Sequence, residues 1–443
     1  MGFSNDFLWG VSGTAYQMEG AHDADGKGPG IWDTLSDGHV KHGDNGNTAC
    51  DCYHRFREDI ALMRQMRLKA CRFSVSWPRI MPRQNQVNQR GIEFYRELVR
   101  ELAAAGITPL CTLYDWNLPM WIHKKGGWEW DGISDQFARL VEIMLEALSD
   151  QVSVWMTLHE PAAFVGKGYM TGVYAPFETA SAEGRQSVQR LCRLTKNVLL
   201  AHGKAVAVIR EKSVLPAQIG ITVDGKLFLP WEETEKEIER ARGAMFPVQE
   251  ADCRFVNWWI DPIVEGRLPA VLADMVSTAE RKLIAQPLDF IGYDCYKASN
   301  YDDDRGKNTA VYPGFPRTAA DRPITPDALY WAVRFCQERY RLPLLIAENG
   351  MANVDFRMQG SMVHDQQRIQ YLKRYLGGLR RAVDEGYQVM GYLYGSVFDK
   401  FEWTQGYDER LGLVYIDYRT QERIPKDSAM WYAQAISTNG ENL

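Results

Sequence analysis

The sequence predicts an α/β protein in which one (β/α)8 TIM barrel spans residues 1–443 as a single domain. Three observations favour this fold. Short apolar runs rich in β-branched and aromatic residues alternate with longer segments of helical periodicity. The alternation yields eight strands, and no Gly- or Ser-rich linker divides it. No glycine-rich phosphate loop follows any strand, which argues against a pair of nucleotide-binding sheets.

The expected strands are continuous apolar runs, which are typical of a parallel sheet covered by helices. They cover residues 7–17, 70–77, 108–116, 152–160, 218–223, 288–296, 344–348 and 389–397. Helical periodicity between them is clearest over residues 55–66, 92–105, 137–148, 187–210 and 369–376, with a charged segment at 232–242.

Local signals indicate where some of these helices begin and end. Gly106 is expected as the glycine that follows the helix at 92–105. Thr325 and Pro326 are expected to open a helix, with Thr325 as its N-cap. A loop containing Asp302, Asp303 and Asp304 is expected on the face where the strands end.

The composition excludes several classes of protein. The chain is 45% hydrophobic and 12% aromatic, which argues against disorder. Its net charge of −6 lacks the basic excess of a nucleic-acid binder. No apolar stretch approaches the ~18 residues of a membrane helix, and the N-terminus has no signal-like segment. We therefore expect a cytoplasmic protein with no nucleic-acid or membrane partner.

Eight scattered cysteines fit buried thiols in a reducing compartment better than a disulfide framework. Cys50 and Cys52 form the one close pair, but their spacing is shorter than that of zinc sites, and no second pair accompanies them. No metal site is expected.

Two glutamates stand directly after apolar runs, where barrels carry their chemistry. Glu160 ends the fourth strand, and Glu348 ends the seventh, 188 residues later. Two carboxylates facing each other across a barrel mouth are what glycoside hydrolysis uses, one as an acid and the other as a nucleophile or base. The alternative is that each glutamate is a capping or ion-paired loop residue.

Ordered motifs along nearly the whole chain carry a family resemblance. They are Phe7-Leu8-Trp9-Gly10, Tyr16-Gln17-x-Glu19-Gly20, Ile31-Trp32-Asp33, Tyr53-His54-Arg55, Arg72 to Ile80, Gly126-Gly127-Trp128, His159-Glu160-Pro161, Glu348-Asn349-Gly350, Phe401-Glu402-Trp403 and Gly406-Tyr407. With these motifs the chain resembles glycoside hydrolase family 1, the β-glucosidase family, whose fold is the same barrel.

The resemblance implies a retaining double displacement with Glu160 as the acid/base and Glu348 as the nucleophile. Arg72 matches the arginine beside the nucleophile, and Tyr296 matches the tyrosine that hydrogen-bonds it. Retention requires the two carboxyl groups to lie ~5 Å apart. The resemblance implies no metal or organic cofactor.

The sugar-binding positions match only in part. Gln17, Glu402 and Trp403 match residues that hold the glycone hydroxyls, and the carboxylate of Glu402 argues against a 6-phosphorylated glycone. Trp116 is retained within a changed motif, Asp115-Trp116-Asn117. Four substitutions stand where the family has His, Asn, Asn and Trp, namely Asp115, His159, Asp294 and Gly395.

Two interpretations of these substitutions stay open. They could compensate one another, for instance through a pair of Asp115 and His159, in an ordinary β-glucosidase. They could instead rebuild the −1 subsite for a glycone altered at C2, such as a 2-acetamido or 2-amino β-hexoside, with space left beside Gly395. A catalytically silent carbohydrate-binding barrel is a third alternative.

The sequence therefore predicts a retaining exo-β-glycosidase, β-glucosidase-like, that acts on a small-molecule β-glycoside or oligosaccharide. It does not indicate the glycone, the aglycone or the oligomeric state.

Overall fold

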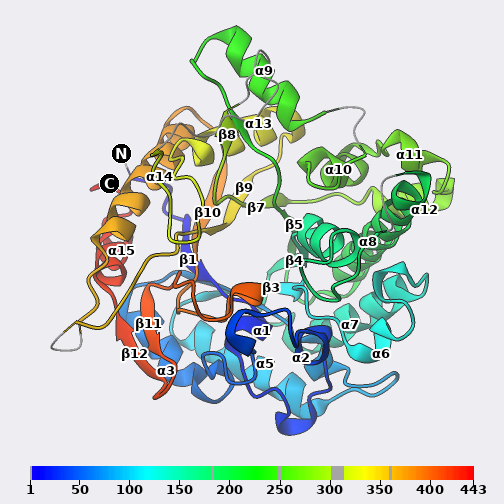
Figure 1. The fold of residues 1–443 in the computed structure, drawn as a ribbon, viewed down its shortest axis with the longest axis horizontal. Coiled ribbons are helices and arrows are strands. Elements are labelled where there is room, and N and C mark those ends of the chain that lie inside the picture. The colour runs from blue at the N-terminus through cyan, green and yellow to red at the C-terminus, as the bar shows by residue number, and fades with distance from the viewer. Residues whose placement is uncertain (1, 181–183, 248–250, 301–313, 359–361) are drawn as a thin grey trace.

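The computed structural model describes residues 2–180, 184–247, 251–300, 314–358 and 362–443. Its centre is a closed barrel of eight strands, each parallel to both neighbours (Figure 1). In order around the barrel these are β1 (Leu8–Ser12), β2 (Ala70–Ser74), β3 (Thr108–Tyr114), β4 (Val154–His159), β5 (Gln218–Val223), β7 (Phe290–Asp294), β9 (Leu344–Asn349) and β10 (Val389–Gly395). The predicted fold class is confirmed.

Helices lie around the outside of the barrel (Figure 1). The long ones are α3 (Cys52–Gln65), α5 (Gln89–Ala104), α7 (Ile133–Leu148), α8 (Arg185–Lys212), α9 (Glu235–Met245), α13 (Ala328–Tyr340), α14 (Gln366–Asp384) and α15 (Asp427–Ser437). Shorter ones are α1 (Ala15–Met18), α2 (Ile31–Leu35), α4 (Trp77–Ile80), α6 (Met120–His123), α10 (Val256–Ile260), α11 (Ala270–Ala273) and α12 (Thr278–Ile284).

Two small sheets accompany the barrel. One pairs β11 (Val414–Asp417) with β12 (Glu422–Pro425), and the other pairs β6 (Phe228–Leu229) with β8 (Ser299–Asn300). The two ends of the chain lie side by side (Figure 1), where Phe3 N–H donates to the Asn439 carbonyl at 3.0 Å.

Several of the predicted boundaries are wrong. The second strand, expected through residue 77, ends at Ser74, and Trp77 begins α4. The first strand ends at Ser12 rather than at residue 17, because the chain turns there into α1, which carries Gln17. Thr325 is not the N-cap of α13; that position belongs to Asp327, and the Thr325 hydroxyl instead accepts a hydrogen bond from Ala298 N–H at 2.9 Å. Gly106 follows α5 with φ +75, as predicted. The loop at Asp302–Asp304 lies outside the described residues.

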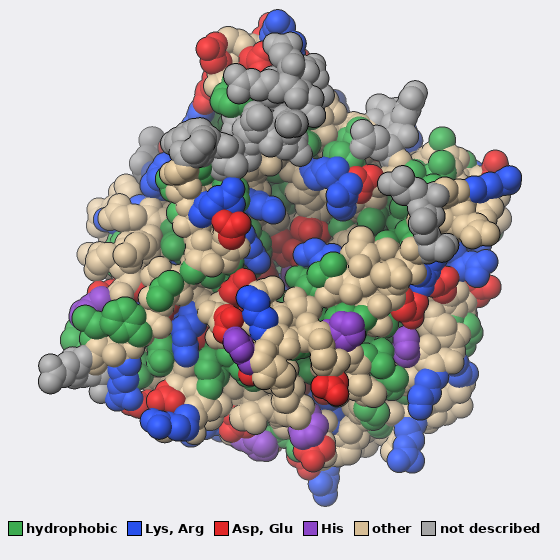
Figure 2. All heavy atoms as spheres, in the orientation of Figure 1, with side chains coloured by type: hydrophobic (Ala, Val, Ile, Leu, Met, Phe, Trp, Pro, Cys, Tyr) green, Lys and Arg blue, Asp and Glu red, His purple; other side chains and the backbone are tan. Residues whose placement is uncertain are grey.

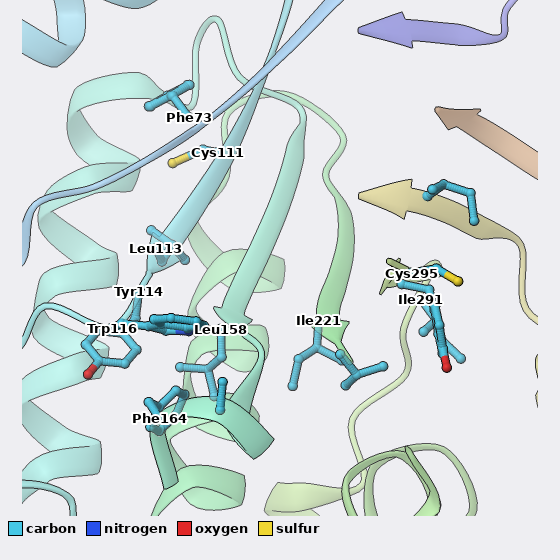
Figure 3. Close-up of a cluster of buried hydrophobic side chains, with 14 of the residues drawn as sticks. Phe73, Cys111, Leu113, Tyr114, Trp116, Leu158, Phe164, Ile221, Ile291 and Cys295 are labelled. Atoms are coloured by element: carbon cyan, nitrogen blue, oxygen red, sulfur yellow. The ribbon is translucent and has the colours of Figure 1, made fainter. Parts of the chain in front are cut away.

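The strands separate two apolar layers. Inside the barrel, buried side chains from alternate strand positions fill the lower part, namely Ala70, Leu110, Val154, Met156, Phe290, Leu345, Ala347 and Leu393. Side chains of the opposite parity, such as Phe73, Cys111 and Ile221, pack outward into the layer under the helices (Figure 3). With its lower end packed solid, the barrel leaves only the carboxyl-terminal edge of the strands open for a site.

All eight cysteines are unpaired, and only Cys52 is not fully buried, as the prediction of buried thiols requires. Among the described helices, none combines the length and apolarity that crossing a membrane needs.

Candidate active site

The carboxyl-terminal edge of the barrel holds a cleft of about 290 Å³. Figure 2 shows the hollow in this face, with acidic side chains at its bottom. Ten of the twelve residues predicted for the site line it: Gln17, Asp115, Trp116, His159, Glu160, Asp294, Tyr296, Glu348, Glu402 and Trp403. The other two, Arg72 and Gly395, do not line it but contact residues that do.

Glu160 and Glu348 reach this cleft from opposite parts of the barrel. Glu160 directly follows β4 with φ +44, and its N–H donates to the carbonyl of Thr222 on β5 at 2.9 Å. Glu348 lies within β9, one residue before its end. Both are buried, at 9% and 6% exposure. The fold thus brings together two carboxylates that are distant in sequence.

Three donors surround the carboxylate of Glu348. Ser12 Oγ and Arg72 Nη2 donate to Oε1 at 2.8 and 3.1 Å, and the Tyr296 hydroxyl donates to Oε2 at 2.6 Å. Burial alone raises the pKa of Glu348, but the charge of Arg72, together with His159, Lys400 and the Tyr296 hydrogen bond, lowers that pKa to about 2. Glu348 is therefore ionised at neutral pH.

Glu160 has the opposite environment. Burial raises its pKa well above the usual range, and the negative charges of Asp224 and Glu348 raise it further, while Lys167 acts against them. This environment favours the protonated form of Glu160 in the free protein. Two carboxyl groups in one cleft, one favouring its protonated form and the other ionised, could serve as a general acid and a nucleophile.

Arg72 also organises two of the substituted positions. Asp115 Oδ2 accepts from Thr14 Oγ1 at 3.0 Å and from Arg72 Nη2 at 3.3 Å. Burial raises the pKa of Asp115 to about 6, although Arg72 lowers it. His159 Nδ1 lies 3.3 Å from the same Arg72 nitrogen, and burial followed by Arg72 lowers the pKa of its ring. Asp115 and His159 do not form the pair considered in the sequence analysis, because each contacts Arg72 instead.

Asp294, the third substituted position, faces His159 with Oδ2 3.4 Å from Nε2. Neither carboxylate oxygen of Asp294 has a hydrogen-bond partner among the described residues, and the same holds for Oδ1 of Asp115. Burial and the charge of Glu348 raise the pKa of Asp294 well above its usual range. These atoms are acceptors, or in protonated form donors, that a ligand can satisfy.

Gly395, the fourth substituted position, lies against Tyr296. A Cβ at Gly395 would stand 2.8 Å from the Tyr296 hydroxyl and 3.4 Å from Oε2 of Glu348. The missing side chain thus makes room for Tyr296 beside Glu348. The Tyr296 hydroxyl therefore occupies the position next to Gly395 where open space was expected.

Lys400 is a site residue that the sequence analysis missed. It is 4% exposed, and its Nζ lies 2.7 Å from Oε1 of Gln17 and 3.0 Å from Oε1 of Glu402. Gln17 Nε2 in turn donates to Oε2 of Glu402 at 3.3 Å. The sequence did contain a signal for Lys400, because this lysine lies two residues before Glu402, which the matched motif assigns to the site. Trp403 completes this wall, with its ring 4.7 Å from that of Trp116.

One cluster has the donor types of a metal site. Ligand atoms of His159, Glu160 and Asp294 lie within 4.8 Å of one another. The guanidinium of Arg72, however, lies 3.3 and 3.4 Å from the two ring nitrogens of His159, so a metal cation there would face a fixed positive charge. The arrangement suits a polar organic ligand better than a metal ion.

Comparison with known proteins identifies the family. The model of glycosyl hydrolase family 1 matches residues 1–441. The chain belongs to this family. It is 38% identical to beta-glucosidase A of Thermotoga maritima, over 99% of this chain and 98% of that enzyme. It is 36% identical to beta-glucosidase A of Acetivibrio thermocellus, over 99% of each chain. This family 1 hydrolase is thus a β-glucosidase-like enzyme of a retaining family.

Solved structures agree with this assignment. The family 1 hydrolase resembles the Thermotoga maritima beta-glucosidase in complex with glucoimidazole, with a TM-score of 0.89 and 37% identity over 99% of each chain. The same beta-glucosidase in complex with noeuromycin gives a TM-score of 0.89 and 36% identity, again over 99% of each chain.

Proposed function

We propose that this family 1 hydrolase cleaves β-O-glycosides from the non-reducing end by double displacement, with Glu348 as nucleophile and Glu160 as acid/base. The observation that carries the proposal is that two buried carboxyl groups, whose pKa values are shifted in opposite directions, line one cleft. Arg72, Ser12 and Tyr296 keep Glu348 ionised, while burial and Asp224 keep Glu160 protonated.

In the first step a lone pair of Glu348 forms a bond to the anomeric carbon as the bond to the leaving oxygen breaks. Glu160 gives its proton to that oxygen, so the aglycone leaves as a neutral alcohol. Esterification removes the negative charge of Glu348, which had raised the pKa of Glu160. Glu160 is then a better base and takes a proton from the water that attacks the glycosyl ester, which restores both carboxyl groups.

The −1 subsite holds the glycone with three pairs of side chains, and two of these pairs include substituted residues. Arg72 pairs with Asp115, His159 with Asp294, and Lys400 with Glu402. The free oxygens of Asp115 and Asp294 are suited to accept hydrogen bonds from glycone hydroxyls, because an unsatisfied buried carboxylate is costly. A glucoside-like glycone has such donors at adjacent carbons. We therefore regard this subsite as remodelled.

A second glycone is favoured by one observation. Both oxygens of Asp294 lack a hydrogen-bond partner among the described residues. The family resemblance implies that the substituted positions surround the C2–C3 side of the sugar. The N–H of a 2-acetamido group, or a 2-ammonium group, is a donor that suits this carboxylate. A 2-acetamido or 2-amino β-hexoside is therefore the alternative substrate.

A panel of 4-nitrophenyl β-glycosides tests both proposals: glucoside, galactoside, fucoside, N-acetylglucosaminide and N-acetylgalactosaminide. A higher kcat/KM for the glucoside supports the first glycone, and a higher value for a 2-acetamido sugar supports the second. Failure to hydrolyse any of them, with Glu348→Gly as the blank, would indicate a silent barrel. Proton NMR of the first-formed anomer tests the mechanism, since initial inversion contradicts a glycosyl ester on Glu348.

A further inference from the structure

Besides Lys400, three cationic side chains line the catalytic cleft. They are Lys167, Lys297 and Arg322. Lys167 lies in the helical segment Ala162–Met170 that follows β4, Lys297 lies just after β7, and Arg322 lies in the segment before α13. All three belong to connections at the carboxyl ends of strands, where a substrate enters a barrel of this kind.

These cations have few partners. Lys167 Nζ lies 3.4 Å from the Tyr174 hydroxyl and 4.6 Å from the centre of its ring. The guanidinium of Arg322 lies 4.5 Å above the ring of Tyr296. Among the described residues, neither Arg322 nor Lys297 forms an ion pair within 4.0 Å. Within the described part of the chain, an anion that entered the cleft would therefore not have to displace a carboxylate from Arg322 or Lys297.

Mutual repulsion within the cluster supports this view. Burial lowers the pKa of Lys297, and the positive charges of Arg322, Lys167 and Arg317 lower it further. Asp224 is the acid that acts in the other direction, and its own pKa is raised by burial. Glu409 and Glu402 face Arg322 only at longer range. At the other two cations the negative groups outweigh burial: Tyr296 and Glu409 raise the pKa of Arg322, and Tyr174 and Asp224 raise that of Lys167, so both side chains stay charged at neutral pH.

The position of Glu160 shows which part of the substrate this cluster would meet. The acid/base must contact the leaving oxygen, so groups on its side of the cleft face the aglycone. Lys167 follows Glu160 by seven residues and contributes to its electrostatic environment, as does Asp224. Lys400 is engaged elsewhere, because it pairs with Glu402 and acts on Asp115 and His159.

From this arrangement we propose that Lys167, Lys297 and Arg322 form an anion subsite for the aglycone, so that the preferred substrates are β-glycosides whose leaving group carries a carboxylate, sulfate or phosphate. This inference rests on the proposed hydrolysis and adds the class of leaving group to it. An anion held there would lose part of its hydration but gain up to three charge-assisted hydrogen bonds.

Two substrates that differ in one charge test the proposal: 4-carboxyphenyl β-glucoside and 4-carbamoylphenyl β-glucoside. The ratio of their kcat/KM values is measured for the wild type, Lys297→Met and Arg322→Met. Because the intrinsic reactivity of each phenol cancels between variants, a fall of roughly threefold or more in the ratio is expected from a lost charge near the surface. Lys236→Met, an exposed lysine on α9, is the matched control.

An unchanged ratio in both cleft variants would overturn the proposal. A preference of the wild type for 4-nitrophenyl β-glucuronide over the glucoside would also do so, because it would place the anion on the glycone. If neither aryl glucoside is cleaved, the proposed glucoside substrate is wrong, and the anion subsite is then tested separately by ligand binding. Calorimetry should then show 4-hydroxybenzoate binding more tightly than 4-hydroxybenzamide to the wild type but not to Lys297→Met, and equal binding would contradict it.

Discussion

Arg72 donates a hydrogen bond from Nη2 to Oε1 of Glu348 across the barrel, at 3.1 Å, with 0% and 8% of the two side chains exposed. The same guanidinium also contacts Asp115 and His159. One cation in the middle of β2 therefore lowers the pKa of the proposed nucleophile and contacts two substituted residues.

Replacing Arg72 by Met should shift the pH dependence of kcat/KM. Without the guanidinium the pKa of Glu348 rises from about 2, so the acidic limb moves to higher pH. Loss of one preorganised charge should also lower kcat by roughly 10²–10³. Initial rates measured across the pH range give both the position of the acidic limb and the change in kcat. Arg72→Lys, which keeps the charge, is the control, and an unmoved acidic limb in Arg72→Met would contradict the assignment.

Replacing Glu160 by Ala should make the rate depend strongly on the leaving group. A general acid contributes about 10²–10⁴-fold where the leaving oxygen needs a proton. Alkyl β-glycosides should therefore lose far more activity than 2,4-dinitrophenyl β-glycosides, whose phenolate leaves unaided. Glu348→Ala should abolish the hydrolysis of both. A uniform loss across leaving groups in Glu160→Ala would contradict an acid role.

Asp224→Asn should move the alkaline limb of the pH profile to lower pH. The negative charge of Asp224 raises the pKa of Glu160, so the neutral amide lets Glu160 lose its proton earlier as the pH rises. The maximal rate should change less than the limb. Asp252→Asn, which removes an ion pair with Lys226 outside the cleft, should leave the limb in place. If the alkaline limb has the same position in both variants, Asp224 does not raise the pKa of Glu160.

Lys400→Met should weaken both folding and glycone binding. It leaves the Glu402 carboxylate buried without its 3.0 Å partner, which is expected to cost about 1–3 kcal/mol in the free energy of unfolding. Urea titrations measure this loss, and KM for the best glycoside should rise. Adding Glu402→Gln should restore part of the stability but not the activity. Simple additivity of the two stability losses would argue that Lys400 and Glu402 are uncoupled.

Gly395→Ala should slow catalysis by moving Tyr296. The added Cβ would stand 2.8 Å from the hydroxyl that now donates to Glu348 at 2.6 Å. Because a hydrogen bond to a charged group is worth about 1.5–3 kcal/mol, kcat should fall roughly 10- to 100-fold. Tyr296→Phe should show a similar loss, and the double variant should be little worse than either. Full activity in Gly395→Ala would contradict this account.

The sequence by itself determined the barrel, because eight apolar runs separated by amphipathic helices have few other ways to bury their apolar surface. It also placed Glu160 and Glu348 at strand ends, and its motifs located ten of the residues that line the cleft. The first strand was extended too far, through Gln17, because Thr14 and Tyr16 after the turn at Ser12 are residue types that also favour a strand.

Only the tertiary structure decided how the substituted residues are paired. Asp115 and His159 both turn to Arg72, Asp294 faces His159, and Lys400 joins Gln17 to Glu402. Periodicity reports which face of an element is buried, whereas the pairing of charges depends on atoms brought together from strands far apart in the chain. In a buried site the short distances between charged groups determine the pKa of each group, and the sequence does not give these distances.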